Sequence, residues 1–254
     1  MSYFNFDGQN ALVTGASSGL GRQFALALAQ AGANVALAAR RQERLTELAQ
    51  EIQNLGRQSL VLPMDVTNEQ QIAAGIAMIK QSWGKLDIAV NNAGTSNAAP
   101  AEEMTLEDWQ KVIDVNMTGV FLTAKHAAGL MKEYNYGRII NTASIYGLVG
   151  NSSFTVANYH ASKGAVVNLT RALAAEWAKY GITVNAIAPG FFPSEMTEAF
   201  FADEGFKQYV AAYCPMKRAG QDGELNTALL FLADQGSSYV TGQTIAVDGG
   251  WTSV

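Results

Sequence analysis

The chain has 254 residues, of which 48% are hydrophobic and 15% charged, and its formal net charge is −5 at pH 7. This length suits one large α/β domain, residues 1–254, and no apolar run approaches the roughly 18 residues of a membrane span. The acidic balance argues against nucleic acid or an anionic membrane as partner, and the single cysteine excludes an internal disulfide and a cysteine-based metal cluster. We therefore expect a cytoplasmic protein that uses no metal.

Short apolar runs rich in valine, isoleucine and alanine alternate with longer helical stretches, a pattern typical of βαβ units. The fold class that this predicts is α/β: a Rossmann-like, doubly wound parallel sheet of seven strands, with helices on both faces, in a single domain. The predicted strands are Asn10–Thr14, Asn34–Ala39, Ser59–Met64, Leu86–Asn91, Arg138–Ala143, Thr183–Ala188 and Thr244–Val247.

A glycine-rich turn follows the first predicted strand and precedes a helix expected to begin near Arg22. Glycines in such a turn adopt dihedral angles that other residues avoid, and they let the backbone approach a pyrophosphate at the helix N-terminus. The spacing differs from the usual Gly-x-Gly-x-x-Gly, so the turn alone is weak evidence for nucleotide binding. The residues of this turn are Gly15, Ser17, Ser18, Gly19, Leu20 and Gly21.

The second predicted strand ends at Ala39 and continues into Arg40 and Arg41. An acidic residue here would bind the ribose 2′-hydroxyl of NAD, whereas a small residue and two cations leave room and positive charge for a 2′-phosphate. The sequence therefore favours NADP(H) over NAD(H). The alternative is that both arginines belong to a solvent-exposed cluster at the start of the next helix, Gln42–Leu45.

Two further elements lie in the second half of the chain. A long helix is expected from about Leu106 to Tyr134, beginning with the capping-box pattern that Thr105 opens. Residues 189–196 break the alternation of strands and helices, and an aromatic-rich stretch follows. Because ligands bind beyond the carboxyl ends of the strands in such sheets, we expect a substrate lid at about residues 191–212. The alternative is that its phenylalanines fill the core.

Tyr159 and Lys163 are spaced one helical turn apart in a run without proline. On one helix face, the ammonium of Lys163 favours the ionised form of the Tyr159 phenol, which makes the pair a candidate proton-transfer centre. The same spacing recurs at Tyr213 and Lys217, but Pro215 lies between them and makes a shared helix face improbable.

Together these residues resemble the short-chain dehydrogenase/reductase family in its single-domain form, over essentially the whole chain. Within the family, the likeness is to 3-oxoacyl-carrier-protein reductases and to carbonyl reductases of the gluconate 5-dehydrogenase, sugar-acid or polyol type. The matching motifs, all in family order, are Thr14-Gly15-x-x-x-Gly19-x-Gly21, Asp65-Val66, Asn91-Asn92-Ala93-Gly94, Asn116, Ser144, Tyr159-x-x-x-Lys163 and Pro189-Gly190.

The resemblance implies a role for each of these positions. Tyr159 would be the general acid or base, Ser144 would polarise the same substrate oxygen, Lys163 would assist Tyr159 and bind the nicotinamide ribose, and Asn116 would hold a relay water. Structural roles stay open for Asn91 and Gly94. The remaining cofactor contacts implied are Asp65 and Val66 at the adenine, Asn92, Ala93 and Gly94 along the cofactor bed, and Pro189, Gly190, Phe192 and Ser194 near the nicotinamide.

Two side chains and one loop near these motifs are expected to support the site without taking part in the reaction. Tyr146 should shape the pocket, and His160, which diverges from Tyr159 around the helix, should serve in packing or an interface. The 14 residues between Ser144 and Tyr159 slightly exceed the usual family gap, which predicts an enlarged loop over the substrate.

The leading hypothesis is an NADP(H)-dependent oxidoreductase that reduces a small, free ketone or aldehyde to an alcohol. The alternatives are a 3-oxoacyl-carrier-protein reductase, a polyol or sugar-acid dehydrogenase and, from a different class, a non-catalytic nucleotide sensor. The small and apolar residues around the helix that carries Tyr159 predict a subunit interface, and the resemblance implies a homotetramer.

Overall fold

The computed structural model of the chain describes residues 4–195 and 197–254. Seven parallel strands form one sheet in the order β3-β2-β1-β4-β5-β6-β7. The predicted fold class is confirmed, and the strand ends differ from the predicted ones by at most two residues. The strands are β1 (Asn10–Thr14), β2 (Asn34–Ala39), β3 (Ser59–Pro63), β4 (Ile88–Asn91), β5 (Gly137–Thr142), β6 (Ile182–Pro189) and β7 (Thr244–Val247).

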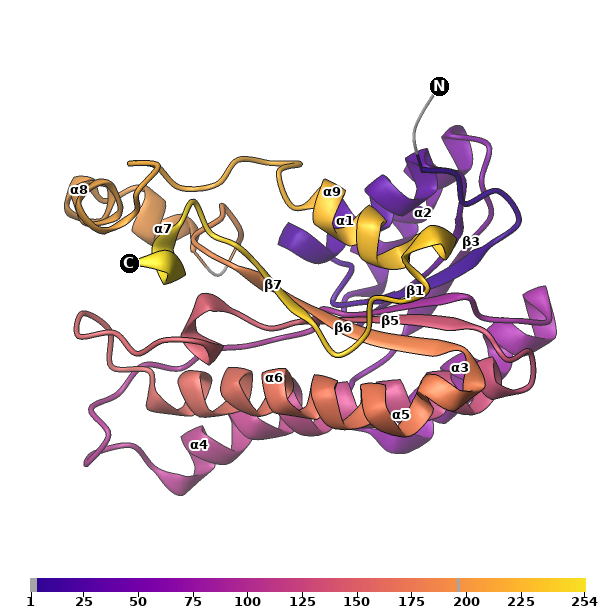
Figure 1. Cartoon of the computed structure of the whole chain (residues 1–254), viewed down its shortest axis with the longest axis horizontal. Coiled ribbons are helices and arrows are strands. Elements are labelled where there is room, and N and C mark those ends of the chain that lie inside the picture. Colours follow the sequence, from indigo (N-terminus) through magenta and orange to yellow (C-terminus); the bar gives the residue numbers. More distant parts are fainter. Residues whose placement is uncertain (1–3, 196) are drawn as a thin grey trace.

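Two helical layers cover the sheet (Figure 1). On one side lie α1 (Gly19–Gln30), α2 (Gln42–Asn54) and α9 (Asn226–Ala233), and on the other α3 (Glu69–Trp83), α4 (Leu106–Ile113), α5 (Gly119–Lys132) and α6 (Ala157–Trp177). Because both faces are covered, the central strands β5 and β6 are buried along their length, and their polar side chains Arg138, Asn141 and Asn185 form hydrogen bonds. No helix in the described part of the chain is both long and apolar enough to cross a membrane.

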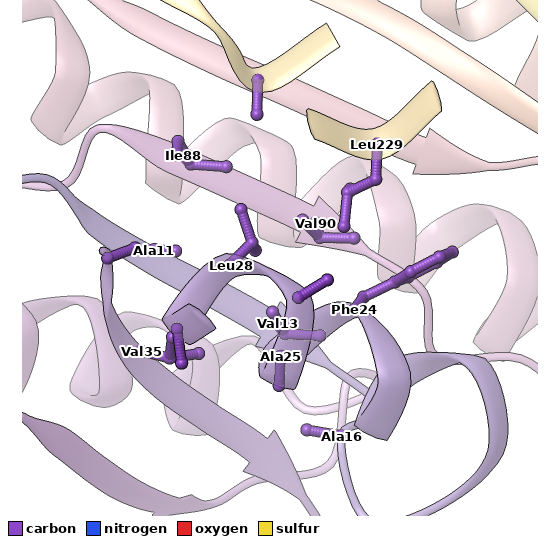
Figure 2. Close-up of a cluster of buried hydrophobic side chains, with 14 of the residues drawn as sticks. Ala11, Val13, Ala16, Phe24, Ala25, Leu28, Val35, Ile88, Val90 and Leu229 are labelled. Atoms are coloured by element: carbon purple, nitrogen blue, oxygen red, sulfur yellow. The ribbon is translucent and has the colours of Figure 1, made fainter. Parts of the chain in front are cut away.

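The core on the α1 side shows why the first βαβ unit is so regular. Phe24 and Leu28 of α1 belong to one cluster with Val13 of β1 and Leu229 of α9 (Figure 2), and these four side chains are fully buried. Burying each such side chain contributes about 1.5–3 kcal/mol to folding. This packing fixes the carboxyl end of β1, from which the glycine-rich turn leaves.

Two helix predictions need correction. Helix α1 begins at Gly19 rather than near Arg22, because the Arg22 amide already donates to the Ser18 carbonyl, 3.2 Å away. The long helix is interrupted by a π-helical turn, Asp114–Thr118, and ends at Lys132 rather than Tyr134. Its predicted start is confirmed, since the Thr105 hydroxyl accepts a hydrogen bond from the Asp108 amide.

The aromatic-rich segment after β6 forms α7 (Glu198–Phe201) and α8 (Glu204–Tyr213), beyond the carboxyl end of β6 (Figure 1). Met196, within the predicted lid, lies outside the described residues. Of the five phenylalanines, Phe192 and Phe206 are buried and Phe200 is 44% exposed, so the core-filling interpretation holds for only part of the set. Helix α8 ends at Tyr213, so Tyr213 and Lys217 do not share a helix, as predicted.

Candidate active site

The glycine-rich turn at the end of β1 fits an anion. A Cβ on Gly21 would lie 2.2 Å from the Gly15 carbonyl oxygen, and Gly15 itself has a φ of 66°. Only glycine allows this close approach of α1 to the turn. No side chain caps the first turn of α1, and no acidic residue occupies it, so its free N–H groups and the helix dipole favour a negative charge here.

The residues directly after β4 form hydrogen bonds with the end of β1, next to this turn. The Thr14 hydroxyl accepts hydrogen bonds from the Asn92 and Ala93 amides, at 3.0 and 3.1 Å, and the Asn92 side chain donates to the Thr14 carbonyl. The sheet order reverses between these two strands, which is where doubly wound sheets bind their ligands. Residues 92–94 are thereby held against the crevice.

A cavity of about 1310 Å³ runs along the carboxyl ends of the strands. Its lining includes every catalytic or cofactor-binding residue predicted from the sequence except Gly21 and Asn116. The structure also adds residues to this lining that sequence reasoning missed, among them Thr95, Glu107, Lys111, Thr142, Glu195 and Thr197. The glycine turn and the Tyr159–Lys163 pair therefore line one continuous space.

The candidate proton-transfer residues come from β5 and α6. Lys163 is only 3% exposed, and its Nζ donates to the Thr142 carbonyl at 2.7 Å while lying 5.6 Å from the centre of the Tyr159 ring. Ser144, directly beyond β5, has an extended backbone and accepts a hydrogen bond from the Tyr146 amide. Three ionisable or hydroxylated side chains thus surround one end of the cavity.

Burial controls the ionisation of this pair. It raises the pKa of Tyr159, an effect that a hydrogen bond with Ser144 partly opposes. Burial also lowers the pKa of Lys163 to about 8. Burial therefore sets the pKa of Tyr159 above its usual value, and the expected lowering of that pKa by Lys163 stays a prediction.

Asn116 lies in the π-helical turn, a feature frequently found at functional sites. Its Oδ1 accepts from the Thr95 amide at 2.8 Å, and its Nδ2 donates to the Thr95 carbonyl and to the Ser162 hydroxyl. Both donor hydrogens are used within the protein, so only Oδ1 retains capacity for a further hydrogen bond. The relay water implied for Asn116 stays a prediction.

Comparison with known proteins identifies the family to which this architecture belongs. The family model described as enoyl-(acyl carrier protein) reductase matches residues 15–252. Gluconate 5-dehydrogenase from Gluconobacter oxydans is 38% identical over 98% of this chain and 96% of its own length, and a 3-oxoacyl-[acyl-carrier-protein] reductase from Staphylococcus aureus is 41% identical over 95% and 97%. The chain belongs to the short-chain dehydrogenase/reductase family.

Solved structures agree with this assignment. A short-chain type dehydrogenase/reductase from Mycobacterium marinum superposes with a TM-score of 0.94, at 41% identity, over 98% of this chain and 97% of that one. A gluconate 5-dehydrogenase from Burkholderia cenocepacia, solved with NADP and tartrate, gives a TM-score of 0.95 at 38% identity over 99% and 98%. This chain is an oxidoreductase of that family.

In this short-chain dehydrogenase/reductase, Arg41 after β2 belongs to a larger charged cluster. Arg41 donates to the Ser17 hydroxyl at 3.1 Å and to the Ser18 hydroxyl at 2.8 Å, which joins the end of β2 to the glycine turn. It also forms an ion pair at 2.7 Å with Glu195, and Arg44 forms a second ion pair with the same carboxylate. Arg44 lies in the first turn of α2, three residues after the N-cap Arg41, and this spacing is the sequence signal that points to Arg44.

The remaining candidates near Tyr159 have structural partners. Asn91 donates to the Asn141 side chain on the neighbouring strand at 2.8 Å. Tyr146 packs edge-on against Tyr159 and stacks on His160, with ring centres 6.4 and 4.5 Å away. His160 contacts the Val156 carbonyl and the Asn151 side chain instead of the cavity. The packing role predicted for His160 is confirmed.

Proposed function

We propose that this short-chain dehydrogenase/reductase uses NADP(H) to interconvert a ketone or aldehyde with an alcohol, and that it acts as a carbonyl reductase on a small, free substrate. The observation that carries the proposal is one cavity with two chemically distinct ends. One end holds Arg41 with Ser17 and Ser18, and the other holds Ser144, Tyr159 and Lys163.

The residues present fit the cofactor. The uncapped start of α1 and the close backbone approach at Gly21 suit a pyrophosphate, and Arg40 and Arg41 supply positive charge for a 2′-phosphate. Asp65, Val66 and residues 92–94 would line the adenine and ribose bed, with Phe192 and Ser194 at the nicotinamide end. The similar Burkholderia enzyme was solved with NADP, which supports the choice of cofactor. When bound, the nicotinamide supplies or accepts the hydride.

The protein's own residues would manage the proton. Because burial raises the pKa of Tyr159, its phenol is protonated at neutral pH and able to act as the general acid on a carbonyl oxygen. Ser144 would donate a hydrogen bond to the same oxygen and stabilise the charge that develops on it. The buried ammonium of Lys163 would stabilise the phenolate that remains, and the position of Asn116 beside Thr95 suits a proton path toward solvent.

The test is NADPH oxidation, followed by absorbance, with a panel of ketones and aldehydes. We expect Tyr159→Phe to lower kcat by about 10²- to 10⁴-fold, the usual contribution of a general acid. The same variant should still bind NADPH by fluorescence titration, since only the hydroxyl is removed. Equal activity in both proteins would contradict the role of Tyr159, and NADPH binding without turnover of any substrate would favour the sensor alternative.

The segment after β6 favours an uncharged substrate. Behind the cavity lining, Tyr146 packs edge-on against Tyr159 and Phe191, and Phe191 packs edge-on against Trp251 and at a tilt against Phe154. Among the described residues after β6 that line the cavity, Glu195 is the only charged one. The segment therefore offers no cation to a carboxylate or phosphate.

The relatives named for gluconate and for acyl carrier protein provide the competing substrates. Comparing kcat/KM for uncharged aliphatic and aromatic ketones, a keto sugar acid and a 3-oxoacyl thioester separates the three. We expect the uncharged ketones to give the highest values. A clear preference for the keto acid would instead establish the sugar-acid alternative.

We further propose a cytoplasmic homotetramer. Leu106 and Trp109 of α4 and Phe121 of α5 are 79%, 36% and 41% exposed in the single chain. Large apolar side chains gathered on neighbouring helices are typical of contact surfaces between subunits. These helices lie on the same side of the sheet as α6, which carries Tyr159 (Figure 1).

A further inference from the structure

Glu195 connects the substrate side of the cavity to its phosphate side. It lies in the segment after β6, yet its carboxylate contacts two arginines of the α2 region, far away in the sequence. Arg41 donates to it through Nη2 at 2.7 Å and through Nη1 at 3.3 Å, and Arg44 donates through Nη1. The same Arg41 binds Ser17 and Ser18, so the carboxylate lies where a ribose 2′-phosphate would need these donors.

The charges here compete. Arg41, the Ser18 hydroxyl and Arg44 hold the pKa of Glu195 at about 2, so it is ionised at every working pH. A dianionic phosphate brought to Arg41 would meet this carboxylate, and like charges at close range repel. Because the side chains of Arg41, Arg44 and Glu195 are each 42–50% exposed, their ion pairs are weak enough to exchange.

The segment that carries Glu195 also reaches the nicotinamide end of the cavity. The neighbouring Ser194 side chain contacts the Thr197 hydroxyl at 2.9 Å, and Thr197 donates to the Phe192 carbonyl at 2.7 Å. Phe192, Ser194, Glu195 and Thr197 all line the cavity. A Cβ on Gly19 would lie 3.2 Å from the Ser194 Cβ, so this segment rests on the glycine turn itself.

We propose that Glu195 is a cofactor-selecting residue, whose carboxylate occupies Arg41 and Arg44 until a 2′-phosphate displaces it and thereby releases the segment before α7 from α2. The inference rests on the proposed use of NADP(H). A cofactor without a 2′-phosphate leaves the ion pairs of Glu195 with Arg41 and Arg44 intact. The segment that approaches the substrate therefore responds to which nicotinamide cofactor is bound.

The first test measures affinity by fluorescence titration. Glu195→Gln removes the competing charge, so we expect it to tighten NADPH binding roughly threefold to tenfold and to leave NADH binding within about twofold, as the loss of two exposed ion pairs predicts. The matched control is Glu198→Gln, which removes an equal charge nearby. Within the described residues, Glu198 forms no ion pair, so neither affinity should change. Weaker NADPH binding by Glu195→Gln, or an equal gain for both cofactors, would overturn the inference.

The second test uses a probe that reaches only the phosphate end. Adenosine 2′-monophosphate should increase deuterium uptake in α7 of the wild type, whereas adenosine 5′-monophosphate should not. In Glu195→Gln, uptake should already be high and should not respond to the probe. Binding of the 2′-phosphate probe without any change in α7 overturns the role of Glu195 alone. Failure to bind the probe, together with a preference for NADH, overturns the proposed cofactor as well.

Discussion

At the residue scale, the behaviour of Tyr159 and Lys163 is set by burial more than by their mutual attraction. Desolvation raises the pKa of Tyr159 and lowers that of Lys163, so at neutral pH a neutral phenol lies beside an ammonium that loses its proton near pH 8. A neutral phenol is the form that donates a proton to a carbonyl oxygen. The geometry therefore suits reduction at neutral pH.

The first prediction concerns pH. Since Lys163 is charged below its pKa of about 8 and neutral above it, kcat/KM for NADPH in carbonyl reduction should fall as the pH rises through about 8. Lys163→Met should be slow throughout and should lack this inflection. A pH–rate profile from pH 6 to pH 9.5 measures both, and the same inflection in the variant would assign it to another group.

A second prediction concerns Gly21. Its Cβ would lie 2.2 Å from the Gly15 carbonyl and 2.5 Å from Asn92 Nδ2, so Gly21→Ala forces the turn apart. We expect a loss of about 1–3 kcal/mol in the free energy of unfolding and weaker NADPH binding. Gly129→Ala is the control, because nothing lies within 4 Å of its added Cβ on α5. Urea denaturation should show the control to be more stable than the wild type by about 0.5–1 kcal/mol, because alanine favours a helix interior over glycine. Equal losses in both variants would contradict the steric argument.

At the element scale, the two ends of the sheet have separate tasks. Arg138, near the amino end of β5, is 3% exposed, and its guanidinium donates to the carbonyls of Gly137, Asp234 and Gln235 and stacks on Tyr136. These contacts connect β5 to the segment before β7. The candidate active site occupies the opposite, carboxyl ends of the strands.

This separation gives a third prediction. Arg138→Lys keeps the positive charge but removes the several N–H donors of the guanidinium. It should therefore lower the free energy of unfolding by about 2–4 kcal/mol, the range for several charged hydrogen bonds. Its kcat should stay within about twofold of the wild type at a temperature where it is folded, because Arg138 contacts no cavity residue. Thermal unfolding tests the expected loss of stability, and steady-state assays test the unchanged kcat. Arg57→Lys, at a surface ion pair with Asp7, is the matched control and should change neither.

The sequence predicts elements that depend on local patterns better than those that depend on contacts between residues far apart in the chain. Strand positions, the glycine turn and the Tyr159–Lys163 pair follow from local periodicity and spacing, and the structure agrees with them. The π-helical turn at Asn116 accompanies hydrogen bonds between its side chain and Thr95, a tertiary contact without a local signal. Glu195 has no local signal for the same reason, since only folding brings it to Arg41.

At the scale of the whole molecule, the helical layer that contains α6 also presents apolar surface. Leu106, Trp109 and Phe121 would be exposed in an isolated chain, and covering them by a second copy would shield the side of the sheet that supports Tyr159. Assembly would then stabilise the site by restricting the motions of α4 to α6, since binding to the folded state alone raises its stability.

The last prediction tests that assembly. Light scattering of the wild type at micromolar concentration should give the mass of a tetramer, four times 27.1 kDa. Phe121→Glu places a charge in the expected contact, so it should reduce the mass and lower the melting temperature. Met78→Glu makes the same change on α3, where Met78 is 46% exposed, and should leave the mass unchanged. A monomeric wild type would refute the tetramer, and loss of assembly in both variants would show that added charge, rather than this surface, is responsible.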